Sequence, residues 1–366
     1  MSMVISDRLL RRSQLNTRVS PIAVLCVIAA GALLPFALQF VTAQPNFYLE
    51  LLITFFIYAV IAQCWNLVMA VAGVFSLLPV VLYAVGGYAT SLLVLYMHGN
   101  PWLTIWAAPV AATIAALVVG VPILRLRGVY VALLTLAIQE LLSNYIANGP
   151  AALGRTIGLT VPDIPYAGVF GTTGRSQFYY YLAGAVFLVT MVAVWWLLRS
   201  PLGLALRGIR DSAEYAVSRG VNLVQLKLFV FAFSAFFTGL AGGIYVHFES
   251  DISSSILTFD FLIALSAMII LGGWGTFWGP IVGTAIYVAL DSWLLQPLGA
   301  GFSGITLGAI MVAVVVLTPR GIQPLIADAI WRRLGPWLDE GDEEDDDEED
   351  EEDVGPTPGA RIEEGM

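Results

Sequence analysis

Charged side chains are scarce in this sequence of 366 residues, and lysine is almost absent. Only 12% of the residues are charged, while 58% are hydrophobic and the mean hydropathy is +0.82. Ordinary soluble domains carry about 25% charged residues. The shortage of charge therefore excludes a soluble globular domain and predicts a polytopic membrane protein, built as an all-α bundle of transmembrane helices.

Cysteine and histidine are also rare, with two residues of each type. Cys26 and Cys64 lie in apolar runs, where a thiol usually behaves as a small hydrophobic side chain. This excludes a disulfide framework and a cysteine-rich metal site. His98 and His247 stand alone near span ends, and we expect them to pack or to hydrogen-bond rather than to bind a metal.

The sequence contains no phosphate-binding loop and no recognisable catalytic constellation. Such a loop requires G-x-x-x-x-G-K-[ST], but the only lysine, Lys227, follows Leu226. Any ATP-driven process therefore needs a nucleotide site on another polypeptide. No nucleophile with a neighbouring base and no metal-ligand set stands out, so we predict neither an enzyme nor a cofactor in this chain.

Acidic residues gather at the C-terminus. Residues 339–366 include 16 acidic side chains and one arginine, whereas the rest of the chain has 16 basic and 11 acidic ones. The run GDEEDDDEEDEED at 341–353 repels itself and is predicted to be disordered. Two interpretations remain open: a regulatory or partner-binding tail, or adaptation to high internal salt in a halophile. The preference for arginine fits the second, although genomic base composition alone would also produce it.

Apolar segments long enough to cross a bilayer follow one another along the chain. A hydrocarbon core of about 30 Å needs roughly 20 helical residues. We predict ten spans, the last three of them short, near residues 21–41, 49–71, 76–97, 102–124, 128–147, 177–198, 227–247, 259–273, 280–296 and 303–318.

Basic residues give the orientation, since positive side chains are retained on the cytoplasmic side of a membrane. With a cytoplasmic N-terminus and an even number of spans, only Arg155 and Arg175 of the 17 basic residues lie outside. Both termini are therefore predicted to be cytoplasmic.

The predicted organisation has three parts. The first span is interpreted as an uncleaved anchor, and the alternative is a signal peptide with a small-residue cleavage site at residues 41–43. The parts are a cytoplasmic segment 1–20, a transmembrane permease domain 21–338 with a cytoplasmic loop at 199–226, and the acidic tail 339–366.

Glycines four residues apart predict close contacts between helices, because they put a smooth strip on one helix face. Gly272 and Gly273 precede one such pair. The pairs are Gly239 with Gly243, Gly279 with Gly283, and Gly304 with Gly308.

Glu140 is the clearest ionisable residue inside a span, with Gln139 before it and Asn144 one turn beyond. A charge at mid-bilayer costs roughly 2.5 to 3.5 kcal/mol and usually faces a cavity or a partner. Two interpretations remain open for Glu140 and Asn144: they line a solute pathway, or they bond to an adjacent helix. Weaker candidates, for which an interhelical hydrogen bond is favoured over solute contact, are Gln63, Asn66 and Asp291.

Charge concentrates in the middle of the chain, in LRGIRDSAEYAVSRG at 206–220. Asp211, three residues before Glu214, is typical of a capping box, and Gly220 suits the left-handed position that ends a helix. The segment predicts an amphipathic helix of about two turns, which taken alone is typical of a solvated loop. Its apolar face holds Leu206, Ile209, Ala213 and Ala216, and its polar face holds Arg207, Arg210, Asp211, Glu214 and Ser218.

The spacing of Glu214, Ala216 and Gly220 matches E-A-A-x-x-x-G, with Tyr215 in place of the first alanine. This resembles the cytoplasmic signature of ABC-importer permeases. The resemblance implies a short helix that sits in a cleft of an ATPase subunit and transmits its closure to the membrane helices. The coupling residues it implies are Arg207, Ile209, Arg210, Asp211, Glu214, Ala216 and Gly220.

Further motifs resemble the branched-chain amino-acid ABC permeases, M-type subunit, in the order expected for that family over residues 60–320. The sequence departs from the family pattern at SLLPV (76–80) and GRTIGL (154–159), which weakens any transfer of substrate specificity. The matching stretches are N-L-x(4)-A-G-x-x-S-L at 66–77, RGVYVALLTLAIQEL at 127–141, KLFVFAFSAFFTGLAGGIY at 227–245 and LGGWGTFWGPIVGT at 271–284.

This resemblance implies a non-catalytic, multi-pass permease subunit in the cell membrane. Its expected partners are a second, H-type permease, two ATPase subunits that hold ATP and Mg, an extracytoplasmic solute-binding protein and the lipid bilayer, with no nucleic acid. The implied solute is leucine, isoleucine or valine, while urea, short amides and other amino acids remain open. An alternative of another class is an ion-coupled secondary transporter or channel, which would use the short spans near 272–283 but leaves residues 206–220 without a task.

Overall fold

The computed structural model describes residues 35, 44–123, 126, 128–164, 171–295, 306 and 308–310. Within these residues, six helices are long and apolar enough to cross a membrane, and they coincide with the second to seventh predicted spans. The all-α bundle is thereby confirmed. The six are α3 (Pro45–Asn66) with the π-helix η1 (Leu67–Val71), α4 (Pro79–Met97), α5 (Pro101–Thr104) with α6 (Ala107–Ile123), α7 (Val129–Asn148), α8 (Gly171–Arg199) and α11 (Leu223–Glu249).

Shorter helices follow in the positions of the eighth and ninth predicted spans. They are α12 (Phe259–Gly272) and α13 (Gly279–Leu290), the latter continued by the π-helix η4 (Asp291–Leu295). The first and tenth predicted spans lie almost entirely outside the described residues, and so do the cleavage site at 41–43 and the acidic tail.

Proline and small polar residues mark where several helices begin. Pro45, Pro79 and Pro101 each occupy the first turn of a helix, where the missing N–H costs no hydrogen bond. Asn100 accepts a hydrogen bond from the backbone N–H of Trp102 and so caps α5. These signals fix the beginnings of helices whose apolar interiors alone would not define them.

Glycine brings α11 into close contact with the helices on either side of it. A Cβ atom at Gly239 would lie 2.8 Å from the carbonyl oxygen of Ala108 in α6, and one at Gly86 in α4 would lie 2.6 Å from the Cα of Gly239. A Cβ at Gly243 would lie 2.8 Å from that of Ala108. The predicted Gly239–Gly243 strip is therefore an interface, and α11 is held between α4 and α6.

Close packing at glycines also joins α12 to α13. A Cβ at Gly283 would lie 2.6 Å from the backbone nitrogen of Gly272, and one at Gly279 would collide with the carbonyl of Gly273. The Gly279–Gly283 pair is thus confirmed as a contact strip. Of the third predicted pair, Gly304 lies outside the described residues.

Residues 72–78 form a non-helical connection between η1 and α4. The indole Nε1 of Trp65 donates to the carbonyl of Ser76 at 2.7 Å, and the backbone N–H of Leu77 donates to Oγ1 of Thr135 at 3.0 Å. Irregular backbone in a membrane protein needs such partners, because lipid supplies none. The segment is therefore fixed by side chains of α3 and α7.

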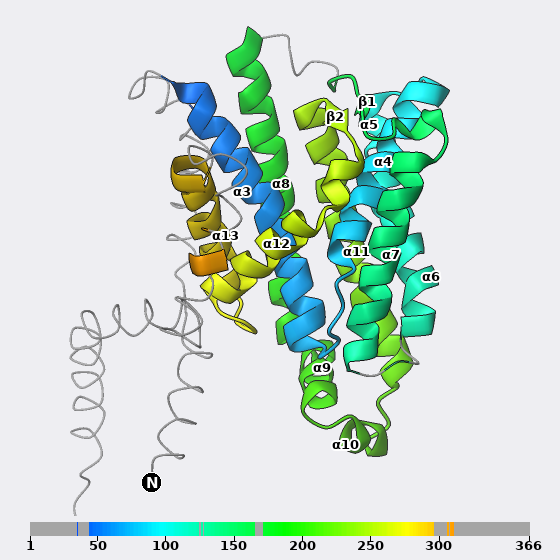
Figure 1. The fold of residues 1–366 in the computed structure, drawn as a ribbon. Helices are drawn as coiled ribbons and strands as arrows, with labels where there is room; N and C mark the ends of the chain where they lie inside the picture. The colour runs from blue at the N-terminus through cyan, green and yellow to red at the C-terminus, as the bar shows by residue number, and fades with distance from the viewer. Residues whose placement is uncertain are drawn as a thin grey trace, which may run out of the picture.

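The two ends of the bundle carry different structures (Figure 1). One end, called here the α9–α10 end, is formed by α9 (Pro201–Asp211) and α10 (Ala213–Ser218). The opposite end, the β1–β2 end, holds β1 (Leu159–Thr160), which pairs antiparallel with β2 (Asp251–Ile252). Two 3₁₀ turns, η2 (Ala151–Leu153) and η3 (Ser254–Leu257), adjoin these strands in the sequence.

Candidate functional site

Residues 206–220, where the pattern predicts an amphipathic helix of about two turns, belong to two helices, α9 and α10. Ser212 has an extended backbone, with φ of −156° and ψ of 101°, and therefore ends α9 and separates it from α10. The carbonyl of Ser212 accepts a hydrogen bond from the N–H of Ala216 at 3.1 Å. The prediction that Asp211 opens a helix through a capping box is wrong, because Asp211 is the last residue of α9.

Three residues of the predicted apolar face and the predicted helix end at Gly220 are as expected. Leu206, Ile209 and Ala216 are buried, as expected for the apolar face. Gly220 has a φ of +83°, and the N–H of Val221 bonds to the carbonyl of Ala216 at 3.1 Å. This is the hydrogen-bond pattern of a helix that ends at a left-handed glycine.

Arg210 joins α9 to the membrane helices. Its Nη1 donates to the carbonyl oxygen of Ala70 in η1 at 3.0 Å. A Cβ at Gly73, whose φ is +69°, would lie 3.3 Å from the Cα of Arg210 and 3.1 Å from its Cγ. α9 therefore packs closely on the segment that follows η1, where the positive φ and the short distances both favour glycine.

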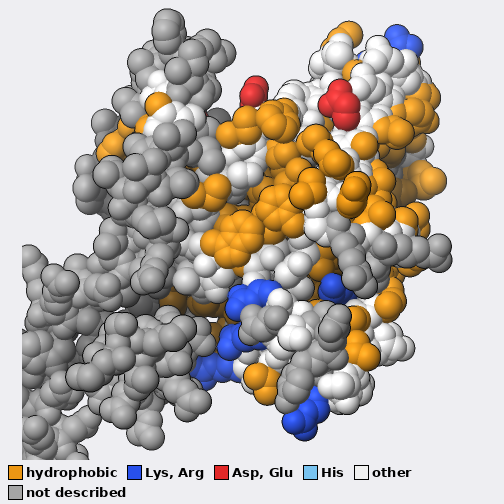
Figure 2. All heavy atoms as spheres, turned by 60° about the horizontal axis from the view of Figure 1, so that its bottom comes forward, with side chains coloured by type: hydrophobic (Ala, Val, Ile, Leu, Met, Phe, Trp, Pro, Cys, Tyr) orange, Lys and Arg blue, Asp and Glu red, His pale blue; other side chains and the backbone are white. Residues whose placement is uncertain are grey.

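Positive side chains gather at this end of the molecule. Figure 2 shows Lys and Arg side chains around the α9–α10 end, below a wide hydrophobic surface. The guanidinium of Arg199 lies 4.1 Å from the ring centre of Trp195, at the end of α8. Basic residues next to an apolar belt are typical of the cytoplasmic boundary of a membrane protein.

The three polar residues of α7 have different environments. Glu140 and Asn144 are exposed, and Nδ2 of Asn144 donates to Oε1 of Glu140 at 2.7 Å. Gln139 is buried and donates to the carbonyl of Leu257 at 3.1 Å. Gln139 thus ties α7 to η3, while Glu140 and Asn144 form a polar pair on the outer surface of the described chain.

Asn66, for which a hydrogen bond to a neighbouring helix was favoured over solute contact, bonds to a loop. Its Nδ2 donates to the carbonyl of Thr276 at 3.0 Å, and its Oδ1 accepts from the N–H of Gly275 at 3.0 Å. Both ends of the amide therefore bind the loop between α12 and α13. Gln63 is buried in the same helix, and Asp291 begins η4.

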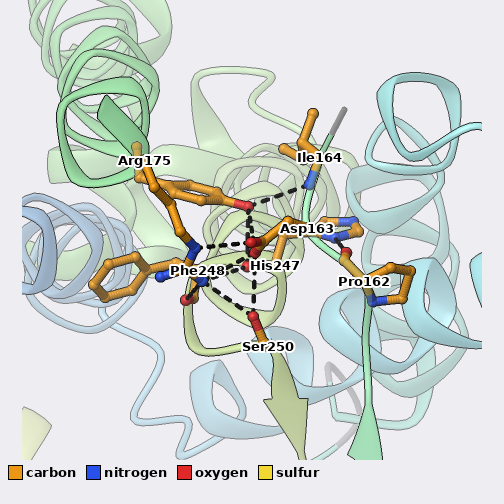
Figure 3. Close-up of polar contacts among 8 residues, drawn as sticks. Pro162, Asp163, Ile164, Arg175, His247, Phe248 and Ser250 are labelled. Atoms are coloured by element: carbon orange, nitrogen blue, oxygen red, sulfur yellow. Dashed lines mark hydrogen bonds and ion pairs between the residues drawn. The ribbon is translucent and has the colours of Figure 1, made fainter. Parts of the chain in front are cut away.

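Sequence reasoning missed a polar network at the β1–β2 end (Figure 3). Arg175 in α8 binds Asp163 through Nε and Nη2, both at 2.9 Å. Nη2 also donates to Oγ of Ser250 at 3.0 Å and to the carbonyl of Phe248 at 2.5 Å. Burial raises the pKa of Asp163, but Arg175 outweighs this and holds that pKa below its ordinary value. The only signal in the sequence was that Arg175 and Arg155 stand apart from the cytoplasmic basic residues.

His247 belongs to the same network. Its side chain is buried, and Nδ1 lies 2.8 Å from the carbonyl oxygen of Pro162. The hydroxyl of Tyr179 donates to the carbonyl of His247 at 2.9 Å. The expectation that this histidine packs and hydrogen-bonds is confirmed, and the described residues contain no group of three His, Cys, Asp or Glu side chains that could hold a metal ion.

The described chain is a polytopic helical bundle with the helix pair α9 and α10 at one end, as expected of a membrane permease subunit. The chain belongs to the family described as branched-chain amino acid transport system / permease component, whose model matches residues 47–315. The predicted family is thereby confirmed. Membership makes the chain a multi-pass protein of the cell membrane, in a family whose permeases work with ATPase and solute-binding subunits.

Curated relatives include the high-affinity branched-chain amino acid transport system permease protein LivM of Escherichia coli. It is 27% identical over 293 residues, which cover 74% of this chain and 68% of the relative. The probable branched-chain amino acid permease LivM of Methanocaldococcus jannaschii is 25% identical, over 70% of this chain and 81% of its own. The guanosine ABC transporter permease NupQ of Bacillus subtilis is 26% identical over 48% of this chain and 57% of its own. No solved structure matches the chain.

Proposed function

We propose that the chain is the translocating subunit of an ATP-driven importer of branched-chain amino acids. It has no catalytic role of its own, and ATP and Mg are bound by partner ATPase chains. The observation that carries the proposal is the attachment of α9 to η1, through Arg210, Ala70 and Gly73. A solvated loop helix needs no such attachment, whereas a helix that transmits force does.

Force applied to α9 and α10 has a defined route into the membrane helices. The first contact is the hydrogen bond from Arg210 to Ala70, in the π-helix that continues α3. π-helical turns often mark functional positions, because their widened hydrogen bonding is easily changed. Asn66, one turn earlier, holds the backbone of Gly275 and Thr276. A displacement of α9 therefore acts on α3 and then on the α12–α13 loop.

The arrangement of partners follows from charge and polarity. The basic α9–α10 end faces the cytoplasm and receives an ATPase subunit, and the β1–β2 end faces the extracytoplasmic binding protein. The exposed pair Glu140 and Asn144 faces a second, H-type permease across a shared solute pathway, because a carboxylate facing lipid is costly. We assign coupling to the ATPase to the segment 199–226 and solute translocation to the permease domain 21–338.

A second candidate solute is a purine nucleoside. The similarity to the guanosine permease NupQ favours it, although that match covers 48% of this chain. Both candidates keep the same machinery and differ only in the solute that the binding protein delivers.

The two solutes are distinguished in the purified complex of both permeases, the ATPases and the binding protein, reconstituted in liposomes. We expect leucine, isoleucine or valine to stimulate ATP hydrolysis and uptake, with guanosine inert. Stimulation by guanosine alone would replace the first candidate by the second. Accumulation of solute by this chain without ATPase partners would refute the importer proposal altogether.

A further inference from the structure

A cavity of about 370 Å³ lies among α3, α4, α11, α12 and α13 and extends to the loop that follows β2. Cavities that bind small organic molecules in proteins have volumes of about 300 to 1,000 Å³. Four helices each contribute one tyrosine to its wall. They are Tyr58, Tyr83, Tyr245 and Tyr287.

The tyrosines form part of an aromatic cluster around the cavity. The ring of Tyr83 lies 5.5 Å from that of Tyr245 and 5.6 Å from that of Phe261, which it faces at 29°. The ring of Tyr58 lies 5.4 Å from the same phenylalanine. These rings offer both an apolar wall and negatively polarised faces, which attract organic cations.

The hydroxyl of Tyr83 lacks a hydrogen-bond partner among the described residues, although the residue is fully buried. A buried hydroxyl without a partner costs about 1 to 3 kcal/mol. Tyr83 lines the cavity, and a ligand that reached this hydroxyl would supply the missing partner.

The charged residues that line the cavity are all acidic. Glu249, Asp251 and Asp260 contribute carboxylates, and no described Lys, Arg or His side chain lines the wall. The guanidinium of Arg175, in the neighbouring network, is paired with Asp163 and lines a second cavity, which shares Glu249 with this one. A wall of one charge sign concentrates ligands of the opposite sign.

The three carboxylates do not converge as metal ligands. No three His, Cys, Asp or Glu side chains of the described chain come close enough together to hold an ion. Separate carboxylates, hydroxyl groups and aromatic faces suit an extended organic cation better than a compact metal ion.

We propose that this cavity is a binding site for a small aliphatic primary ammonium compound. Glu249 pairs with the ammonium group, the hydroxyl of Tyr83 accepts a hydrogen bond from it, and the aromatic rings cover the aliphatic part. The inference goes beyond the proposed function, because it assigns a ligand site within this one subunit. It holds whether or not the importer carries branched-chain amino acids.

The test measures binding to the full chain in lipid nanodiscs by titration calorimetry, with empty nanodiscs as the blank. Isopentylamine carries the ammonium and branched aliphatic group of leucine, whereas 4-methylpentanoate carries the same aliphatic group and a carboxylate. We expect isopentylamine to bind and 4-methylpentanoate not to bind. Equal binding of the two, absence of isopentylamine binding, or displacement of isopentylamine by Ca²⁺ at equal concentration would overturn the proposal.

Two pairs of variants locate the site. Tyr83→Phe and Glu249→Gln are expected to weaken isopentylamine binding about tenfold, the typical effect of losing a hydrogen bond to a charged group. Their controls are Tyr88→Phe and Glu50→Gln. Tyr88 is in the same helix and also has a buried hydroxyl without a partner among the described residues, but neither control residue lines the cavity. Equal losses in the variants and in their controls would place the binding elsewhere and refute the assignment.

Discussion

Arg210 in α9 donates a hydrogen bond to the carbonyl oxygen of Ala70 in η1, across 3.0 Å and 140 positions of sequence. The donor is charged and the acceptor belongs to a π-helical turn, so the bond joins a short surface helix to a long membrane helix at a point where the backbone is already irregular. Because of this contact, the α9–α10 end is attached to a membrane helix and is not a solvated loop that only connects two spans.

Replacing Arg210 with alanine is expected to uncouple ATP hydrolysis from transport. Hydrogen bonds to charged groups contribute about 1.5 to 3 kcal/mol, so we expect solute moved per ATP to fall about tenfold or more while ATPase subunits remain bound. The measurement is uptake and hydrolysis in the same proteoliposomes. Arg219→Ala, an exposed arginine beyond α10, serves as control and should keep coupling near that of the unaltered chain. A coupling ratio that is unchanged in Arg210→Ala would contradict the role of this bond.

Substitution of Gly73 should lower stability for two reasons, its backbone conformation and its close contact with Arg210. Alanine at a φ of +69° costs about 1 to 2 kcal/mol, and its Cβ would also lie 3.1 Å from Cγ of Arg210. Gly220→Ala is the control for the backbone conformation, because Gly220 has a φ of +83° at the left-handed end of a helix and nothing within 4 Å of an added Cβ. We expect Gly73→Ala to lower the thermal unfolding temperature more than Gly220→Ala does, and to lower coupling as well. Equal shifts in the two variants would mean that the contact with α9 contributes nothing.

The fold follows from the sequence where the determinants are local. Apolar runs predict the six long helices, because a backbone in lipid must satisfy its own hydrogen bonds. The Gly239–Gly243 strip predicts a close helix contact, although the sequence does not show that the neighbour is α6. The break between α9 and α10 lies at Ser212, one residue beyond the helix start predicted at Asp211, since the amphipathic pattern continues through Ser212 and does not encode its extended backbone.

The site is less accessible to sequence reasoning because its contacts join distant positions. Asn66 binds residues more than 200 positions away, and Arg210 binds Ala70, 140 positions away. The family motifs include the segments 66–77, 206–220 and 271–284, but only tertiary packing shows which of them contact one another. The cavity around Tyr83 likewise requires helices that only the folded chain brings together.

Acid should weaken the network that Asp163 forms with Arg175. The pKa of Asp163 is lower in the folded chain than its ordinary value, so its carboxylate contributes stability above the unfolded pKa and loses it as pH falls through the folded pKa. Both side chains are partly exposed, and we expect a contribution of no more than about 1 kcal/mol. Thermal unfolding followed from neutral pH to below the ordinary aspartate range checks this. In Asp163→Asn, the thermal unfolding temperature should fall less as the pH is lowered. An unchanged fall would assign the acid sensitivity to other groups.

Glu140 provides the sharpest test of where solute and partner permease meet this chain. Its carboxylate is exposed at mid-helix and accepts a hydrogen bond from Asn144 at 2.7 Å, a pairing that reduces but does not remove the cost of a charge beside lipid. If the pair faces a shared pathway, Glu140→Ala should lower uptake at matched membrane levels at least fivefold, while Glu140→Gln should retain part of it because Asn144 can still donate.

Leu133→Ala is the matched control for this position. Leu133 is also exposed and lies two turns earlier on the same face of α7, so its loss removes apolar contact without removing charge. Uptake that is unchanged in Glu140→Ala would reject a functional role, and equal losses in both variants would assign the effect to packing against a neighbour. A loss confined to the Glu140 variants requires water or a polar partner at the middle of the membrane, which lipid does not provide and a second permease across the pathway does.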